Sequence, residues 1–220
     1  ETGSGQGQDK PKFREIFSKS RAINYLSAAR LFLFGARDVW FVVALPVYLA
    51  SSLGWDNGYV GSFLALWIIA YGVVQTQAPR FTGKREGRVP DGKAAMRWAL
   101  VLALTPALIA LALHYEVHPA ISLVGGLMVF GALFAINSSL HSYLIVSYAG
   151  SDGVSLDVGF YYMANALGRL LGTLLSGLVF QLYGLEACLW ISTLFILLAA
   201  LISIGLPRHQ PPVSSSQGVS

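Results

Sequence analysis

Residues 24–53 read NYLSAARLFLFGARDVWFVVALPVYLASSL, and this stretch decides the class of fold. A helix that crosses a bilayer needs about 20 predominantly apolar residues, and this stretch is longer. Its centre nevertheless carries Arg37 and Asp38. A charge at membrane depth costs about 2.5–3.5 kcal/mol on insertion scales, so such residues usually mark a functional pathway. The stretch therefore predicts a transmembrane helix that contributes to the passage of a charged solute.

The composition of the whole chain agrees with a membrane protein. The 220 residues are 55% hydrophobic and 12% charged, whereas soluble domains carry about 25% charged residues. The sequence lacks the alternating ten-residue segments of an outer-membrane barrel. The net charge of +4 comes with basic residues that cluster beside apolar runs, which is typical of membrane topology. We therefore expect a helical membrane protein with a lipid environment and no nucleic-acid partner.

Sequence signals for metal, cofactor or catalytic chemistry are missing. Cys188 is the single cysteine, and the four histidines show no ligand spacing. The sequence contains no phosphate-cradling loop, no HExxH motif and no nucleophile elbow. We expect neither a metal, nor a cofactor, nor an enzyme.

The apolar runs predict an all-α integral membrane bundle of six transmembrane helices within residues 23–207. Residues 1–22 are expected to form a cytoplasmic linker or an interfacial helix, and residues 208–220 a disordered cytoplasmic tail. The six predicted spans are residues 24–50, 59–78, 97–114, 119–148, 158–183 and 185–206.

The distribution of basic residues predicts the orientation. Lysines and arginines precede the first span and fill the connection between the second and third spans, whereas the connections after spans one, three and five contain none. The positive-inside rule then places both termini in the cytoplasm of a multi-pass protein. Only the connection after the fourth span, residues 148–157, is neutral to acidic where a basic one is expected.

The charged residues of the first span share one helical face. Arg30 and Arg37 are seven residues apart, and Arg37 lies near the middle of the span. Arg37 is either an anion-binding residue or half of a structural ion pair with Asp38. Neighbouring helical side chains point about 100° apart, so ideal pairing of these two is not expected. Arg30 is either a first contact for the solute or an anchor that snorkels to the cytoplasmic interface.

Two stripes run along the fifth span. One consists of small residues and predicts close helix packing: Ala164, Gly168, Gly172 and Ser176. The other is polar, has an arginine near mid-depth and predicts the wall of a water-filled cavity: Tyr161, Asn165, Arg169 and Thr173.

The fourth span adds a polar cluster, residues 137–143, whose amides and hydroxyls are expected mainly to join helices. His141 within it is either structural or a proton carrier, because its reference pKa is near 6.5. Asp38 is the other candidate for proton coupling.

The charges inside the membrane predict an anionic substrate. Two central arginines face one aspartate, and Arg30 adds a further positive charge if it faces inward. Guanidinium forks bind phosphate-like and carboxylate oxygens bidentately. The expected substrate-binding residues are Arg37, Arg169, Arg30, Asn165, Tyr161 and Asn137.

Six spans with a long basic connection after the second resemble one half of a major facilitator superfamily transporter. That fold has two six-helix halves, each made of two inverted three-helix repeats, with the substrate between the halves. The resemblance implies that this chain is the second half. An N-terminal six-helix half, or a second copy, would complete the transporter.

The amino-acid sequence of several spans resembles that of the organoarsenical efflux permeases of the ArsJ type. The similar segments are residues 24–41, 63–67, 78–80 and 159–169. The resemblance implies an antiporter of the bacterial inner membrane that exports 1-arseno-3-phosphoglycerate and confers arsenic resistance. A glyceraldehyde-3-phosphate dehydrogenase would supply this ester by using arsenate in place of phosphate. Two alternatives remain open: a permease for another phosphorylated metabolite or a drug, and a membrane assembly module that transports nothing.

Overall fold

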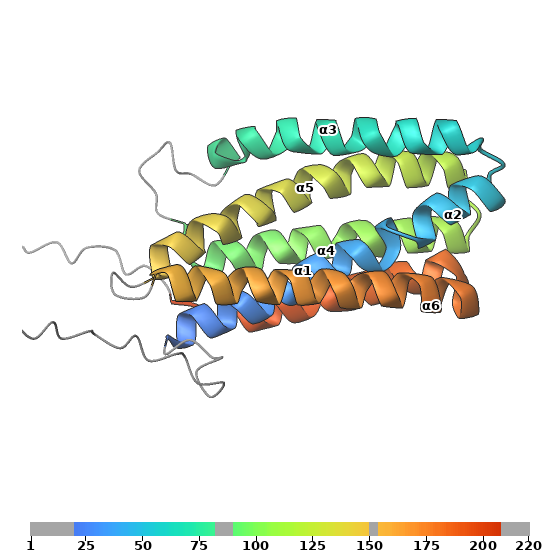
Figure 1. The fold of residues 1–220 in the computed structure, drawn as a ribbon. Helices are drawn as coiled ribbons and strands as arrows, with labels where there is room; N and C mark the ends of the chain where they lie inside the picture. Colours follow the sequence, from blue (N-terminus) through green and yellow to red (C-terminus); the bar gives the residue numbers. More distant parts are fainter. Residues whose placement is uncertain (1–19, 82–89, 150–153, 208–220) are drawn as a thin grey trace, which may run out of the picture.

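The computed structural model describes residues 20–81, 90–149 and 154–207, which form a bundle of long helices (Figure 1). No strand occurs in these three ranges. Most of the predicted N-terminal linker and all of the predicted C-terminal tail lie outside them. The helices are α1 (Arg21–Phe41), α2 (Ala44–Ser51), α3 (Asn57–Phe81), α4 (Gly92–His114), α5 (Pro119–Tyr148) and α6 (Val154–Ser203).

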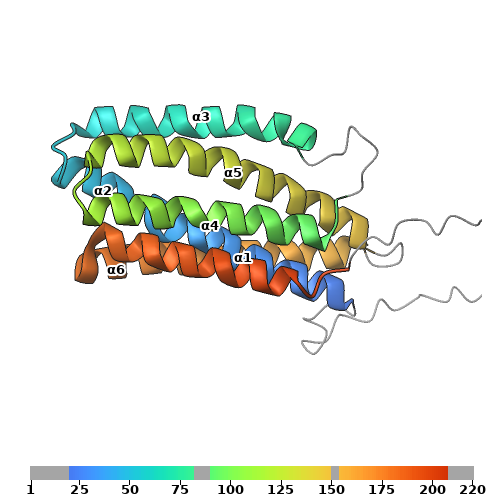
Figure 2. The same ribbon diagram turned by 180° about the vertical axis from the view of Figure 1, so that it is seen from behind.

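The 50-residue α6 is two helical arms joined at Gly184. A straight helix of this length would measure about 75 Å, more than twice the hydrocarbon thickness of a bilayer. Gly184 has φ 78° and ψ −175°, a conformation that only glycine adopts readily. The chain doubles back there, so residues 154–183 and 185–203 run side by side in opposite directions (Figures 1 and 2).

Five helical segments of the described chain are long and apolar enough to cross a membrane, counting α6 once. They are Arg21–Ser51, Asn57–Ala78, Gly92–His114, Pro119–Tyr148 and Ser155–Ser203.

A turn at residues 42–43 divides the first of these segments into α1 and α2. Pro46 lies four residues after Val42, so it offers no N–H to the Val42 carbonyl and its ring crowds that carbonyl. The sequence alone predicted one continuous span over residues 24–50. The proline explains why the helix breaks in its second half.

Helix α1 is packed between the two arms of α6. A Cβ atom built on Gly35 would lie 3.1 Å from the Gly168 oxygen of the first arm and 3.3 Å from the Phe195 ring of the second. A Cβ on Gly168 would clash with the Leu31 carbonyl oxygen of α1. The small-residue stripe of residues 164–176 is therefore a close helix contact, which confirms the packing role that its spacing predicts.

Helices α3, α4 and α5 complete the bundle. Trp67 of α3 packs against Gly131 of α5, and its indole nitrogen donates a 3.0 Å hydrogen bond to the Leu127 carbonyl. The opposite side of α3 exposes large apolar side chains to its surroundings, as expected of a surface in lipid. These side chains are Leu66, Ile68, Ile69 and Val73, each more than half exposed.

The described chain begins and ends at the same end of the bundle (Figures 1 and 2). There the backbone nitrogen of Gly92 donates a 3.2 Å hydrogen bond to the Pro207 carbonyl. Arg21 and Lys93 belong to the helix starts at this end. Asp56 and Glu186 lie at the opposite end, beside the start of α3 and the hairpin of α6.

Candidate functional site

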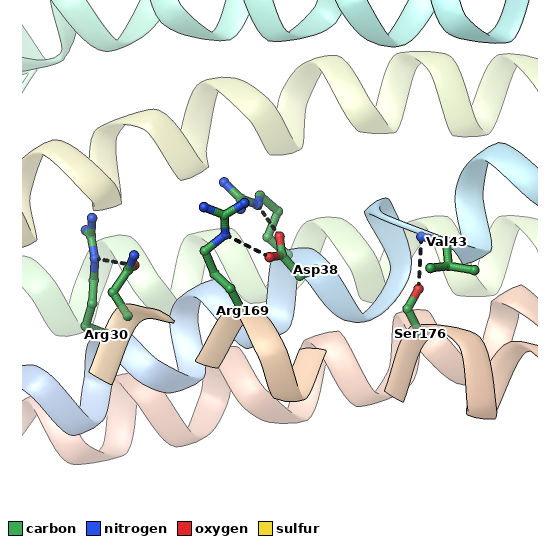
Figure 3. A network of polar contacts seen from close by, with 7 residues as sticks. Arg30, Asp38, Val43, Arg169 and Ser176 are labelled. Atoms are coloured by element: carbon green, nitrogen blue, oxygen red, sulfur yellow. Dashed lines mark hydrogen bonds and ion pairs between the residues drawn. The ribbon is translucent and has the colours of Figure 1, made fainter. Parts of the chain in front are cut away.

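One buried carboxylate holds two arginines at the contact of α1 and α6. Asp38 is 1% exposed, and its Oδ1 accepts a 2.6 Å hydrogen bond from Nε of Arg37. Its Oδ2 accepts a 3.2 Å hydrogen bond from Nε of Arg169, which comes from the first arm of α6 (Figure 3). The two neighbours therefore do form an ion pair, but through one hydrogen bond and not through the two parallel bonds of an ideal arginine–carboxylate pair.

The close approach of the two helices explains why Asp38 reaches Arg169. A Cβ atom on Gly172 would lie 2.7 Å from the Gly35 carbonyl oxygen and 3.0 Å from Cβ of Asp38. Only a residue without a side chain allows α6 to lie this close to Asp38. The small residue and the arginine, three positions apart in the first arm, thus assemble one site.

Arg30 forms a second polar centre, closer to the start of α1 (Figure 3). Its Nε donates a 3.1 Å hydrogen bond to the side-chain oxygen of Asn165 in α6. Its Nη1 donates to the carbonyl and hydroxyl oxygens of Ser138 in α5, at 3.2 and 3.3 Å. Because Arg30 is 5% exposed and tied to both helices, its interpretation as a snorkelling interfacial anchor was wrong.

Aromatic rings connect the two polar centres. The guanidinium carbon of Arg30 lies 3.9 Å from the ring centroid of Phe34, and that of Arg37 lies 5.0 Å from the same centroid. Tyr161 lies 5.0 Å from Arg30, and Phe134 lies 5.3 Å from Arg37. A cation within about 6 Å of a ring centroid is attracted by the ring, so these faces partly replace lost water.

The remaining residues singled out from the sequence lie in the core. Asn137 is fully buried, and its amide donates to the Trp98 and Leu133 carbonyls at 3.0 and 2.9 Å. It therefore joins α5 to α4, and it forms no hydrogen bond with any of the three arginines. His141 is 1% exposed, and its Nδ1 has no hydrogen-bond partner in the described chain.

The net charge of these two centres is positive. Together they contain three arginines, whereas Asp38 supplies the one carboxylate that pairs with any of them among the described residues. Arg30 has no acidic partner among the residues that the structure describes, although it is almost completely buried. A buried charge that is hydrogen-bonded yet unneutralised favours an incoming opposite charge, here an anion.

Access to the site is from the side of Arg169. The Arg169 side chain is 56% exposed and that of Arg37 is 15% exposed, whereas Asp38 is sealed beneath them. The polar stripe of the first arm thus passes from buried Tyr161 through half-buried Asn165 to exposed Arg169.

Ser176 has a role that the sequence analysis missed. Its hydroxyl oxygen accepts a 3.3 Å hydrogen bond from the backbone nitrogen of Val43 (Figure 3) and a 3.0 Å hydrogen bond from that of Ala44. These N–H groups are freed by the break between α1 and α2. The sequence does contain two hints of this contact: Pro46, which breaks the first predicted span, and Ser176, which lies on the small-residue stripe of the fifth. Only the packing of the helices shows that the serine lies at the break.

The ring of Phe134 was also missed. It lies four residues before Ser138 on α5, so both face α1.

Among the described residues, no group of three or more His, Cys, Asp or Glu side chains is placed to hold a metal ion.

Comparison with known proteins identifies the family. None of the curated proteins compared with the chain matches it. The family model of the Major Facilitator Superfamily matches residues 26–219, which include every described helix except the start of α1. Because this match covers most of the 220 residues, the chain belongs to the Major Facilitator Superfamily of membrane transporters.

Proposed function

We propose that the chain transports a small organic anion by alternating access. The observation that carries the proposal is the pairing of Arg37 and Arg169, the latter exposed, with one buried carboxylate. Beside this pair lies the buried Arg30, which has no acidic partner among the residues that the structure describes. Arg37 and Arg169 bind one anionic group. Arg30, two helical turns along α1 and about 10 Å away along the axis, binds a second, with Asn165 and Tyr161 beside it.

Our candidate substrate is the ester 1-arseno-3-phosphoglycerate, with arsenic resistance as the outcome. The resemblance of residues 24–41 and 159–169 to organoarsenical efflux permeases supports it. An ester with an anionic group at each end also fits two separate arginine centres. In this proposal the transporter is an antiporter, with Asp38 or His141 as the proton carrier, and a glyceraldehyde-3-phosphate dehydrogenase supplies the ester.

We propose that each arm of α6 crosses the membrane separately, which gives six crossings and one half of the transporter fold. A second six-helix unit, from an N-terminal half or another copy, covers the face that bears Arg169. The exposure of this arginine supports a covering partner, since a lipid-facing charge is costly. Arg21, Lys93 and Arg97, which lie near the starts of α1 and α4, support a cytoplasmic position for that end at the bacterial inner membrane.

Transport of the ester tests the proposal. Everted membrane vesicles that contain the protein should accumulate the ester, and Arg169→Ala should abolish this accumulation at an unchanged protein level. Arg97→Ala is the matched control, because Arg97 is exposed near the start of α4 and has no contact with the site. Undiminished accumulation by Arg169→Ala would refute the arginine role. Competition by sugar phosphates and other organic anions separates the arsenate ester from rival substrates.

The internal pairing of Asp38 with both arginines also favours a second candidate, an assembly module whose charges serve folding alone. Exchanging Arg37 and Asp38 distinguishes the two. If the exchanged protein reaches normal levels and the wild type shows no flux for any anion tested, the assembly module is the better account. Flux in the wild type that the exchange abolishes favours the transporter.

A further inference from the structure

We infer that Asp38 is a positioning residue, which aligns Arg37 and Arg169 as a two-pronged clamp for a single tetrahedral oxyanion group. This inference rests on the proposed anion transport and specifies how its central site works. It gives Asp38 a task that differs from carrying protons or competing with the substrate.

The atoms used in the two ion pairs support this role. Arginine binds a carboxylate most strongly through two parallel N–H bonds, which occupy one edge of the guanidinium group. Asp38 instead receives a single bond from Nε of each arginine, one on each oxygen. Within the described residues the Nη atoms of Arg37 and Arg169 donate no other hydrogen bond. Each arginine is therefore anchored by its Nε atom alone. The edge of the guanidinium group formed by its two Nη atoms, here called the outer edge, remains available to a ligand.

The surroundings hold this arrangement in place. Asp38 is fixed in the α1–α6 contact beneath Gly172, where it is 1% exposed. The guanidinium group of Arg37 lies against the rings of Phe34 and Phe134. Arg169 approaches from the other helix and is open on its far side. The shared carboxylate also screens two cations that would otherwise repel each other, so the clamp exists before the anion arrives.

The number of donors indicates which anionic group fits. Two outer edges present four directed Nη–H bonds, and the two oxygens of a carboxylate are satisfied by one edge alone. A phosphate or arsenate group has at least three terminal oxygens that accept bonds, enough to engage both edges. The clamp should therefore prefer tetrahedral oxyanions to carboxylates.

Anion binding to the purified full-length protein tests this role, with inorganic phosphate, 3-phosphoglycerate and acetate as probes in calorimetric titrations. Asp38→Asn keeps the shape of the side chain but removes its charge and one acceptor. We expect it to weaken phosphate binding at least tenfold and to remove the preference for phosphate over acetate. Asp38→Glu, which restores the charge, should recover part of both. Asp56→Asn, an exposed change at the far end, should bind like the wild type.

Arg169→Lys keeps the inference testable if Asp38→Asn fails to fold. Lysine retains the positive charge that faces Asp38 but has no outer edge with paired donors. We expect normal thermal stability and at least tenfold weaker phosphate binding. Unchanged or tighter phosphate binding by Asp38→Asn or Arg169→Lys, beside clear binding by the wild type, would overturn the positioning role alone. A wild type that binds none of the probes would overturn the proposed anion transport, and this inference with it.

Discussion

At the scale of single residues, the three arginines of the site are held in two different ways. Arg37 and Arg169 share one carboxylate, whereas Arg30 is satisfied by a carbonyl, a hydroxyl, an amide and two aromatic rings. Neutral acceptors satisfy the N–H groups of a buried cation but leave its charge in place. The positive charge of Arg30 therefore still attracts an anion, and burying this unneutralised charge lowers the stability of the fold.

We predict that Arg30→Gln impairs transport but leaves the stability of the protein almost unchanged. The glutamine removes the uncompensated charge and keeps a donor for Ser138 or Asn165. The protein level and the unfolding temperature in detergent should therefore change little, while anion accumulation in everted vesicles should fall at least tenfold. Arg97→Gln, an exposed change at the start of α4, serves as the control for lost charge. Full transport by Arg30→Gln would show that the second anion-binding centre does not exist.

At the scale of elements, two features of α6 determine where the arginines lie. The glycines of the first arm let α1 approach until backbone meets backbone, and Ser176 caps the break between α1 and α2. Van der Waals packing of small residues and buried hydrogen bonds are the main forces between helices in lipid. The geometry of the site is therefore a consequence of helix packing and should be lost when that packing is disturbed.

Gly168→Ala should separate the two helices. The added methyl group would clash with the Leu31 carbonyl, and a backbone atom cannot move aside without shifting the helix. We expect a loss of stability of about 1–3 kcal/mol, measured by unfolding in detergent, together with weaker anion transport. Gly177→Ala on the same arm is the matched control, because nothing lies within 4 Å of its added Cβ atom. Equal stability of the two variants would contradict the packing argument.

Ser176→Ala should destabilise the junction of α1 and α2. Two buried backbone N–H groups, of Val43 and Ala44, would lose their acceptor, at a cost of about 1–3 kcal/mol. Ser192, also on α6, is equally buried, but its hydroxyl has no hydrogen-bond partner in the described chain. Ser192→Ala should therefore be neutral or slightly stabilising. Comparison of the two unfolding temperatures checks this, and a reversed order would rule out the cap.

At the scale of the whole molecule, the hairpin in α6 decides how many times the chain crosses the membrane. The two arms lie antiparallel, so the turn between them, at Gly184, is at the same end of the bundle as the start of α3 (Figures 1 and 2). Both ends of the described chain lie at the opposite end. If each arm crosses separately, as proposed, the chain makes six crossings, and the positive-inside rule then predicts that the basic end faces the cytoplasm.

Cysteine labelling should reveal this topology. In a Cys188→Ala background, single cysteines replace Asp56, Lys93 and Tyr183, each of which is exposed. A membrane-impermeant maleimide added outside intact cells should label the cysteines at positions 56 and 183. The cysteine at position 93 should react only after permeabilisation. Labelling of positions 56 and 183 from opposite sides would exclude six crossings.

The sequence by itself determined the class of protein, most of the helices and the identities of the charged residues. These follow from composition, from apolar runs longer than a bilayer is thick, and from the cost of a charge in lipid. The stripe of residues 164–176 also predicted its own packing role, because helical periodicity is a local property. Periodicity likewise placed Tyr161 and Asn165 on one polar stripe, but that Arg30 of another helix contacts both is known only from the packing of α1 against α6.

Only the tertiary structure decided which charges pair. That Asp38 holds Arg169, that Ser138 holds Arg30 and that Ser176 caps a break in another helix depends on contacts between residues more than 100 positions apart. Such contacts are set by the depth and rotation of one helix against the next, which a single helix does not encode. The surroundings of Arg37 are in part a tertiary result as well, because the ring of Phe134, 5.3 Å from its guanidinium carbon, comes from α5.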